Sequence, residues 1–274
     1  MAVDCHIHMA LDGGYWKDAL ARHKDAPDEA FIRRTLETYK TLGFTYLRDG
    51  GDRWNAGKHA SELAGEYGMT YRTPCFPIYR KGHYGSFIGR GFETIDDFRA
   101  LVAEVKKSGG HFIKLMISGL MDFNHYGVLT DEPMPENLIA ELTKISHDEG
   151  FSVMAHANGD SAVRAALAAG VDSIEHGAKP NDEILRLFRE RGAFLCTTIS
   201  PALPYALFDR SVSNASEVEQ FNGNVVFEGI IECAKAALAH DIPVVLGNDV
   251  GCPWITQYDF WRELYYFHQF VGVS

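Results

Sequence analysis

The chain has 274 residues, of which 46% are hydrophobic and 23% are charged, so it can bury a large core without disulfides or structural metals. A formal net charge of −11 disfavours nucleic acid and anionic membranes as partners, and no apolar run is long enough for a transmembrane helix. The five cysteines are scattered without a CxxC pair, which is typical of a reducing compartment. With no visible signal peptide, unless one precedes the given sequence, we expect a cytoplasmic protein.

Short apolar runs alternate with amphipathic segments along the whole chain. Runs bounded by Gly or Pro are typical of buried parallel strands. Eight are present: Ala2–Ile7, Phe44–Leu47, Tyr71–Ile78, Phe112–Ile117, Ser152–Ala155, Val171–Ile174, Phe194–Ile199 and Ile242–Leu246. Between them, residues such as Ile32 and Leu36 recur at helical spacing, and Thr94 with Asp97 indicates a helix start. No GxGxxG or GxxxxGK[ST] motif supports an open nucleotide-binding sheet, so we predict a single (β/α)8 TIM barrel over residues 1–274.

Ionisable residues stand at the ends of these strands. In chain order they are His6 and His8, Arg48 and Asp49, Lys114, His156, His176 and Asp249. The carboxyl ends of barrel strands converge on the mouth where active sites form, and isolated charges there are costly unless they are paired or metal-bound. His6 and His8 lie two apart on a strand, so both imidazoles point to one face. One such pair among twelve histidines is weak evidence, but the further strand-end histidines and aspartate make the set a predicted metal site.

The donor types indicate which metal such a site would take. Imidazoles and a carboxylate without cysteine suit zinc, and also manganese, iron, cobalt or nickel. Lys114 lies among apolar neighbours, and three roles are open for its side chain. It pairs with a carboxylate, it acts as an amine nucleophile of lowered pKa, or it reacts with carbon dioxide to give a carbamate that can bridge two cations.

This ordered set resembles the amidohydrolase superfamily, from Asp4–His8 through to Gly247–Gly251. Three local sequences are similar to those of the imidazolonepropionase-like and Xaa-Pro dipeptidase-like branch: Phe112–Gly119, Met154–Gly159 and Ser173–Gly177. The resemblance implies a site with two zinc ions and a carboxylated lysine as the bridge. The residues that it implies as metal ligands are His6, His8, Lys114, His156, His176 and Asp249.

Two features depart from this family's pattern. In the family, strands before the first barrel strand and after the eighth barrel unit usually form an accessory β-sandwich, which this chain is expected to lack. The chain would then be either a fragment of a longer protein or a barrel-only version. Leu120 stands where relatives often have a second glycine, and Asn248 precedes the aspartate where Thr or Ser is usual. These changes leave the metal ligands intact and bear on the substrate.

The function implied is metal-dependent hydrolysis of an amide or peptide-like C–N bond in a small molecule, by a metal-activated hydroxide. Asp249 is expected to move the proton from water to the leaving nitrogen. Four residues in strand-end loops are candidate substrate contacts: Arg48, His83, His125 and Tyr126. An ion pair with Asp49 explains Arg48 equally well, and a place on the surface explains His125 and Tyr126. The sequence is compatible with a homo-oligomer.

Three other functions remain open at this point. A lactonase or phosphotriesterase uses similar ligands and lacks the sandwich. A lyase or aldolase would use Lys114 as a Schiff-base amine. A truncated barrel could bind metal without turning over any substrate.

Overall fold

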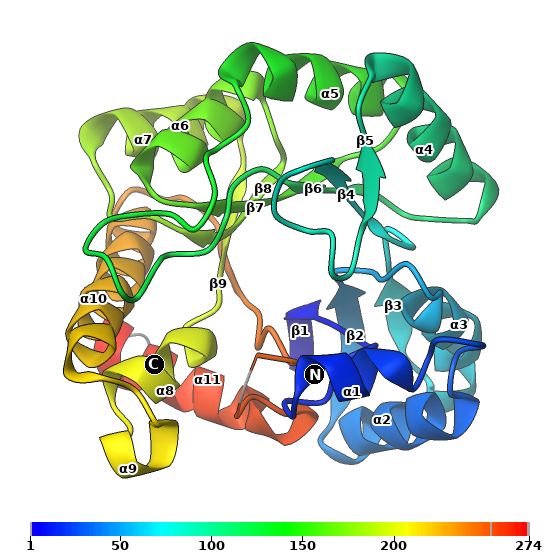
Figure 1. Cartoon of the computed structure of the whole chain (residues 1–274), viewed down its shortest axis with the longest axis horizontal. Coiled ribbons are helices and arrows are strands. Elements are labelled where there is room, and N and C mark those ends of the chain that lie inside the picture. Colours follow the sequence, from blue (N-terminus) through cyan, green and yellow to red (C-terminus); the bar gives the residue numbers. More distant parts are fainter. Residues whose placement is uncertain (1, 253, 273–274) are drawn as a thin grey trace.

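The computed structural model describes residues 2–252 and 254–272, whose strands are parallel and surrounded by helices (Figure 1). A three-stranded sheet has the order β1-β2-β3 and a seven-stranded sheet the order β10-β9-β8-β7-β6-β4-β5. Their bounds are β1 Ala2–Ile7, β2 Phe44–Asp49, β3 Thr70–Arg72, β4 Pro77–Arg80, β5 Arg90–Phe92, β6 Ile113–Met116, β7 Val153–Asn158, β8 Ser173–Gly177, β9 Phe194–Thr197 and β10 Val244–Leu246. Every pairing between neighbouring strands is parallel.

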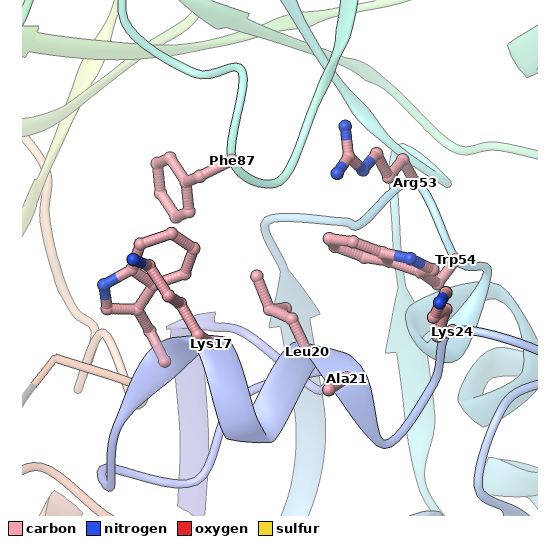
Figure 2. A pocket seen from close by; sticks show the side chains of 8 residues that line it. Lys17, Leu20, Ala21, Lys24, Arg53, Trp54 and Phe87 are labelled. Carbon is pink, nitrogen blue, oxygen red and sulfur yellow. The ribbon is translucent and has the colours of Figure 1, made fainter.

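Helices follow the strands and pack on the outside of the sheets. The α-helices are α1 Trp16–Ala21, α2 Glu29–Thr41, α3 Ala56–Leu63, α4 Ile95–Lys107, α5 Glu136–Asp148, α6 Asp160–Ala169, α7 Asp182–Arg191, α8 Leu203–Ala206, α9 Arg210–Ser213, α10 Glu217–Ala239 and α11 Phe260–Tyr266. Shorter turns of helix are η1 Ala64–Tyr67, η2 Ser200–Ala202, η3 Gln257–Asp259 and η4 Phe267–Val271. The short α1 lies beside the loops that follow β2 and β4 (Figure 2).

Sequence signals explain the best-defined helices. Ile32 and Leu36 are fully buried on the inner face of α2, as their helical spacing predicts. The predicted start of α4 is confirmed as a capping box, in which the Thr94 hydroxyl accepts from the Asp97 backbone and the Asp97 carboxylate accepts from the Thr94 backbone. Within the described residues no helix is long and apolar enough to cross a membrane. All five cysteines are unpaired.

The third predicted strand is broken in two. Pro74 has no N–H to donate, and Cys75 adopts a positive φ of 66°, so the strand stops after β3 and resumes as β4. When β3 and β4 are counted as one interrupted strand, the eight predicted strands are all present. The short β5, which pairs only with β4, was not predicted. The fold is therefore parallel α/β and TIM-barrel-like, although the described residues form two separate hydrogen-bonded sheets.

The two sheets meet where β10 ends beside β1. The Asp249 amide donates to the His6 carbonyl at 2.7 Å, and the Asn248 amide donates to the Asp4 carboxylate at 3.0 Å. This close approach requires Gly247, because a Cβ there would lie 2.4 Å from the His6 Cβ. The two chain segments that carry His6 and Asp249 are thus held together by backbone contacts.

Candidate metal centre

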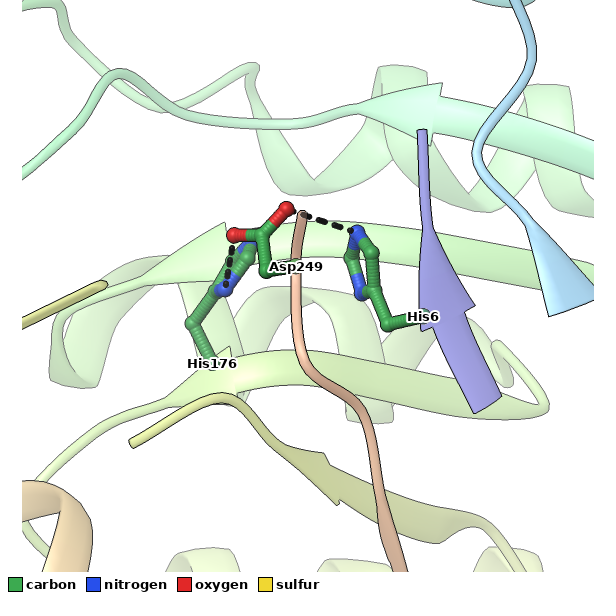
Figure 3. A group of neighbouring side chains, drawn as sticks. All are labelled: His6, His176 and Asp249. Atoms are coloured by element: carbon green, nitrogen blue, oxygen red, sulfur yellow. Dashed lines mark ion pairs between the residues drawn. The ribbon is translucent and has the colours of Figure 1, made fainter. Parts of the chain in front are cut away.

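The carboxylate of Asp249 lies among three of the predicted histidines. Its Oδ1 is 3.5 Å from His6 Nε2 and 3.4 Å from His8 Nε2, and its Oδ2 is 3.8 Å from His176 Nδ1. Figure 3 shows His6 and His176 pointing at opposite oxygens of this carboxylate. Ligand atoms of His6, His176 and Asp249 all lie within 4.8 Å of one another, which is the spacing of a site that can hold a metal ion. Residues from β1, β8 and the segment after β10 therefore meet at one point.

The fourth histidine belongs to the same cluster. His156 Nδ1 lies 2.8 Å from His176 Nε2, and the two rings are 4.6 Å apart. The Asn158 amide lies 3.1 Å from the other nitrogen of His156, and the ring of Tyr84 stacks on His156 at 5.1 Å. His156 is consequently held in place on two sides.

Two of these residues have backbone conformations that side chains rarely allow. His176 has φ 70° and Asp249 has φ 52°. A regular strand would point Glu175 and His176 to opposite faces. The left-handed conformation lets both face the interior, which is a local strain of the kind that proteins keep at functional sites.

A buried carboxylate orients His6 from behind. Glu175 is fully buried, and its Oε2 accepts from His6 Nδ1 at 2.7 Å. Arg48 Nη2 donates to both oxygens of Glu175 at 2.9 and 2.8 Å, and the Ser173 hydroxyl donates to one of them at 2.7 Å. With Nδ1 engaged in this way, Nε2 of His6 is free to face Asp249, which is the arrangement expected behind a metal-binding imidazole.

Lys114 is the unusual member of the cluster. Its side chain is 1% exposed, and its Nζ has no hydrogen-bond partner among the described residues. Burial lowers the pKa of Lys114 to about 8, although Glu175 opposes this effect. At pH 7 about a tenth of the lysine is therefore a neutral amine, which is the form that reacts with carbon dioxide.

The protonation states of the other members also suit a metal. Burial lowers the pKa of His6 and of His156, and lowers that of His176 to about 3, so these imidazoles are neutral at physiological pH. Burial raises the pKa of Asp249, but His6, His8 and His176 outweigh it and hold that pKa well below its usual range. Neutral imidazoles and an ionised carboxylate are the forms that bind divalent cations. The donor set therefore fits the predicted group of ligands.

The predicted substrate contacts occupy different environments. His83, which precedes Tyr84 in the chain, is partly buried, and its Nδ1 is 3.1 Å from Asp131 Oδ1. His125 pairs with Asp122 in an exposed loop, and Tyr126 is 68% exposed. Their role in substrate binding stays a prediction.

The ion-pair partner of Arg48 differs from the Asp49 that was considered from the sequence. Arg48 pairs with Glu175 and not with Asp49, because the Asp49 oxygens are occupied by the Met9 amide and the Thr73 hydroxyl. Its guanidinium is 10% exposed, and it also donates to the Cys5 carbonyl.

Three functional candidates were missed in the sequence: Glu175, Asn158 and Tyr84. A carboxylate inside an apolar strand, next to a histidine, was the available signal for Glu175. Asn158 and Tyr84 gave none, because amide and phenol side chains are common in loops and at strand ends.

Comparisons with known proteins show what this chain is similar to. No known family model matches the chain. Ochratoxinase of Aspergillus niger is 26% identical over 235 residues, which are 72% of this chain and 46% of ochratoxinase. The chain thus spans about half the length of the curated relatives that it matches.

Solved structures cover almost the whole chain. The A. niger ochratoxinase structure has a TM-score of 0.81 at 18% identity, over 99% of this chain and 67% of that one. A candidate prolidase from Bifidobacterium longum has a TM-score of 0.76 at 24% identity, over 99% and 64%. A Xaa-Pro dipeptidase with bound methionine in its active site has a TM-score of 0.74 at 19% identity, over 99% and 70%.

At these identities the solved structures establish the fold, and it is the fold predicted from the sequence. The curated match and the structural neighbours agree on one group of proteins, the prolidase-like enzymes and ochratoxinase. The resemblance predicted from the sequence is therefore confirmed as a similarity of this chain to prolidase-like enzymes and ochratoxinase.

Proposed function

We propose that this chain is the catalytic barrel of a metal-dependent hydrolase that cleaves an amide or peptide-like C–N bond. The observation that carries the proposal is the cluster in which His6, His176 and Asp249 face one another beside the unpartnered amine of Lys114. An apolar chain interior tolerates so many ionisable groups only when they are paired or coordinate a cation. The structural neighbours, named as prolidases, amidohydrolases and ochratoxinase, support C–N bonds as the target.

The proposed ligands of two divalent cations, with zinc as the first choice, are His6, His8, Lys114 as its carbamate, His156, His176 and Asp249. Two bound cations supply Lewis acidity toward a carbonyl oxygen and toward water. A carbamate on Lys114 would supply an anionic ligand at a position where Nζ has no partner among the described residues.

The chain's own residues supply orientation and proton transfer. Glu175 and Arg48 fix the ring of His6, and Tyr84 and Asn158 fix that of His156. Asp249, which its low pKa keeps ionised, accepts the proton that water loses when its oxygen bonds to the carbonyl carbon. The same proton then passes to the nitrogen as the C–N bond breaks, so that an amide and water give a carboxylic acid and an amine.

The test is to measure the metal content of the purified chain and its hydrolysis of Xaa-Pro dipeptides and N-acyl amino acids. Asp249→Asn should lower kcat at least about 100-fold with folding retained, since Asn tolerates a left-handed backbone. Asp241→Asn is the matched control, because Asp241 is also left-handed, with φ 57°, but is exposed. Equal activity of D249N and D241N, or a wild-type chain without bound metal, would refute the proposal.

The low pKa of Lys114 also favours a second candidate, a Schiff-base lyase. Borohydride reduction with a carbonyl substrate separates the two. Covalent trapping at Lys114 supports the lyase, whereas a carbamate signal at that side chain supports the hydrolase.

A further inference from the structure

A pocket of about 500 Å³ lies between α1 and the loops that follow β2 and β4 (Figure 2). Three aromatic rings and three cationic side chains line it: Trp16, Trp54, Phe87, Lys17, Lys24 and Arg53. We call it the aromatic–cationic pocket. Its apolar floor is Leu20, which is 4% exposed.

The charge of this pocket is opposite to that of the protein. The chain carries a net charge of −11, yet no carboxylate is among the described residues that line the pocket. Lys17, Lys24 and Arg53 form no ion pair within the described part of the chain, unlike Arg22 nearby, which pairs with Asp12 at 2.8 Å. Three uncompensated cations around one hollow create a positive potential that attracts an anion.

The aromatic side chains are arranged to take a flat ring. Trp16 and Phe87 meet edge to face at 5.7 Å, and Arg53 lies over the Trp54 ring at 4.5 Å. Lys17 lies over the Trp16 ring at 5.4 Å. A planar π-system can stack among these rings while its negative group meets the ammonium and guanidinium groups.

Aromatic contacts connect the pocket to the candidate metal centre. Phe87 in the pocket wall contacts Tyr84 at 5.6 Å, and Tyr84 stacks on His156 at 5.1 Å. Tyr84 therefore contacts both the wall of the pocket and a histidine of the centre. One substrate can span both sites if its amide bond is near His156 and its far end extends past Tyr84.

We infer that the aromatic–cationic pocket binds the anionic aromatic end of the substrate, such as an aryl carboxylate on the acyl side of the cleaved amide. This inference rests on the proposed amide hydrolysis. A neutral aromatic group would leave the three cations unpaired, and an aliphatic anion would leave the rings without a stacking partner.

Calorimetry with 2-naphthoate tests the ligand class on the intact protein. 2-Naphthamide keeps the ring without the charge, and cyclohexanecarboxylate keeps the charge without the aromatic ring. We expect naphthoate to bind at least about tenfold more tightly than either, with an affinity that falls as salt is added. Equal binding of naphthoate and naphthamide would overturn the inference.

Variants locate the binding. The double variant Lys17→Gln, Arg53→Gln should weaken naphthoate about tenfold. Lys40→Gln is the matched control, because Lys40 lies over the Tyr67 ring at 5.8 Å but outside the pocket, and it should change nothing. If D249N abolishes naphthoate binding while the double variant leaves it intact, the anion binds at the metal centre and the inference is wrong.

Hydrolysis gives the second readout. For a carboxynaphthoyl amide of an amino acid, the double variant should raise KM about tenfold with kcat unchanged, while the amide without the extra carboxylate is unaffected. Equal effects on both amides would contradict the inference. Pocket-dependent binding of naphthoate without turnover of any amide would refute the proposed hydrolysis and still support the ligand class.

Discussion

The ion pair between Glu175 and Arg48 should be among the most costly single interactions to break in this molecule. Glu175 is 0% exposed and Arg48 is 8% exposed, so the two charges share a site with almost no water. Replacing Glu175 with Gln keeps the shape but leaves the Arg48 guanidinium buried without a counter-charge. Breaking a buried pair in this way costs about 3 kcal/mol or more of the free energy of unfolding.

Exposed pairs provide the scale for comparison. Arg186 and Glu190 pair at 2.6 Å on the surface of α7, with both side chains more than half exposed. Glu190→Gln should therefore cost much less stability than Glu175→Gln, because water screens an exposed pair. Both losses can be measured by urea unfolding, provided that the dependence on urea concentration is unchanged between variants.

A double variant separates the ion pair from other effects of the substitution. In Arg48→Met with Glu175→Gln no charge is left unpaired, so the loss should be smaller than the sum of the two single losses by about 1.5 kcal/mol or more. The reasoning fails if E175Q costs no more than E190Q. It also fails if the single losses simply add, because the two charges then do not interact.

Two further predictions concern pH and the space around the site. Burial raises the pKa of Glu263 to about 7, so the folded state binds more protons than the unfolded state between about pH 4.3 and 7. The stability that Glu263 contributes should fall by about 3 kcal/mol as pH rises across that window. Glu263→Gln should remove this contribution from the difference in stability between pH 5 and pH 8, measured by urea unfolding, and an unchanged difference would contradict the assignment. Gly50→Ala would place a Cβ 2.4 Å from His8 Cε1, so this variant should bind less metal than the wild type. Gly229→Ala is the control and should keep its metal content, because a Cβ there meets nothing within 4 Å. Equal metal content in the two variants would refute this prediction.

The sequence was most informative where pattern and chemistry coincide. Apolar runs ended by His6, His156 and His176 predicted both the strands and the cluster, because parallel strands bring their carboxyl ends to one edge. The bounds were less accurate. β7 and β8 continue to Asn158 and Gly177, beyond the apolar runs, since the polar residues at the site are themselves part of the strands.

Contacts between distant segments could not be predicted. Arg48 pairs with Glu175 across 127 residues of sequence, and nothing local to Arg48 distinguishes this partner from the adjacent Asp49. Pro74 alone did not predict that the strand is interrupted there, because proline also occurs at strand ends and in edge strands. Such choices depend on which groups remain unpaired in the folded interior, and that is known only when the chain has closed on itself.

The backbone of His176 shows why the composition of the centre was easier to predict than its geometry. Successive side chains on a regular strand point to opposite faces, so only one of Glu175 and His176 is expected to face the interior. The sequence alone therefore predicts either the carboxylate that orients His6 or the imidazole that faces Asp249 at the site, but not both. The positive φ of His176 gives the site both. Since left-handed residues other than glycine are strained, the surrounding contacts, such as the Thr198 hydroxyl at 2.7 Å from His176 Nδ1, must hold this conformation. The ligand cluster is therefore a property of the closed fold, which enforces a conformation that the strand alone would not adopt.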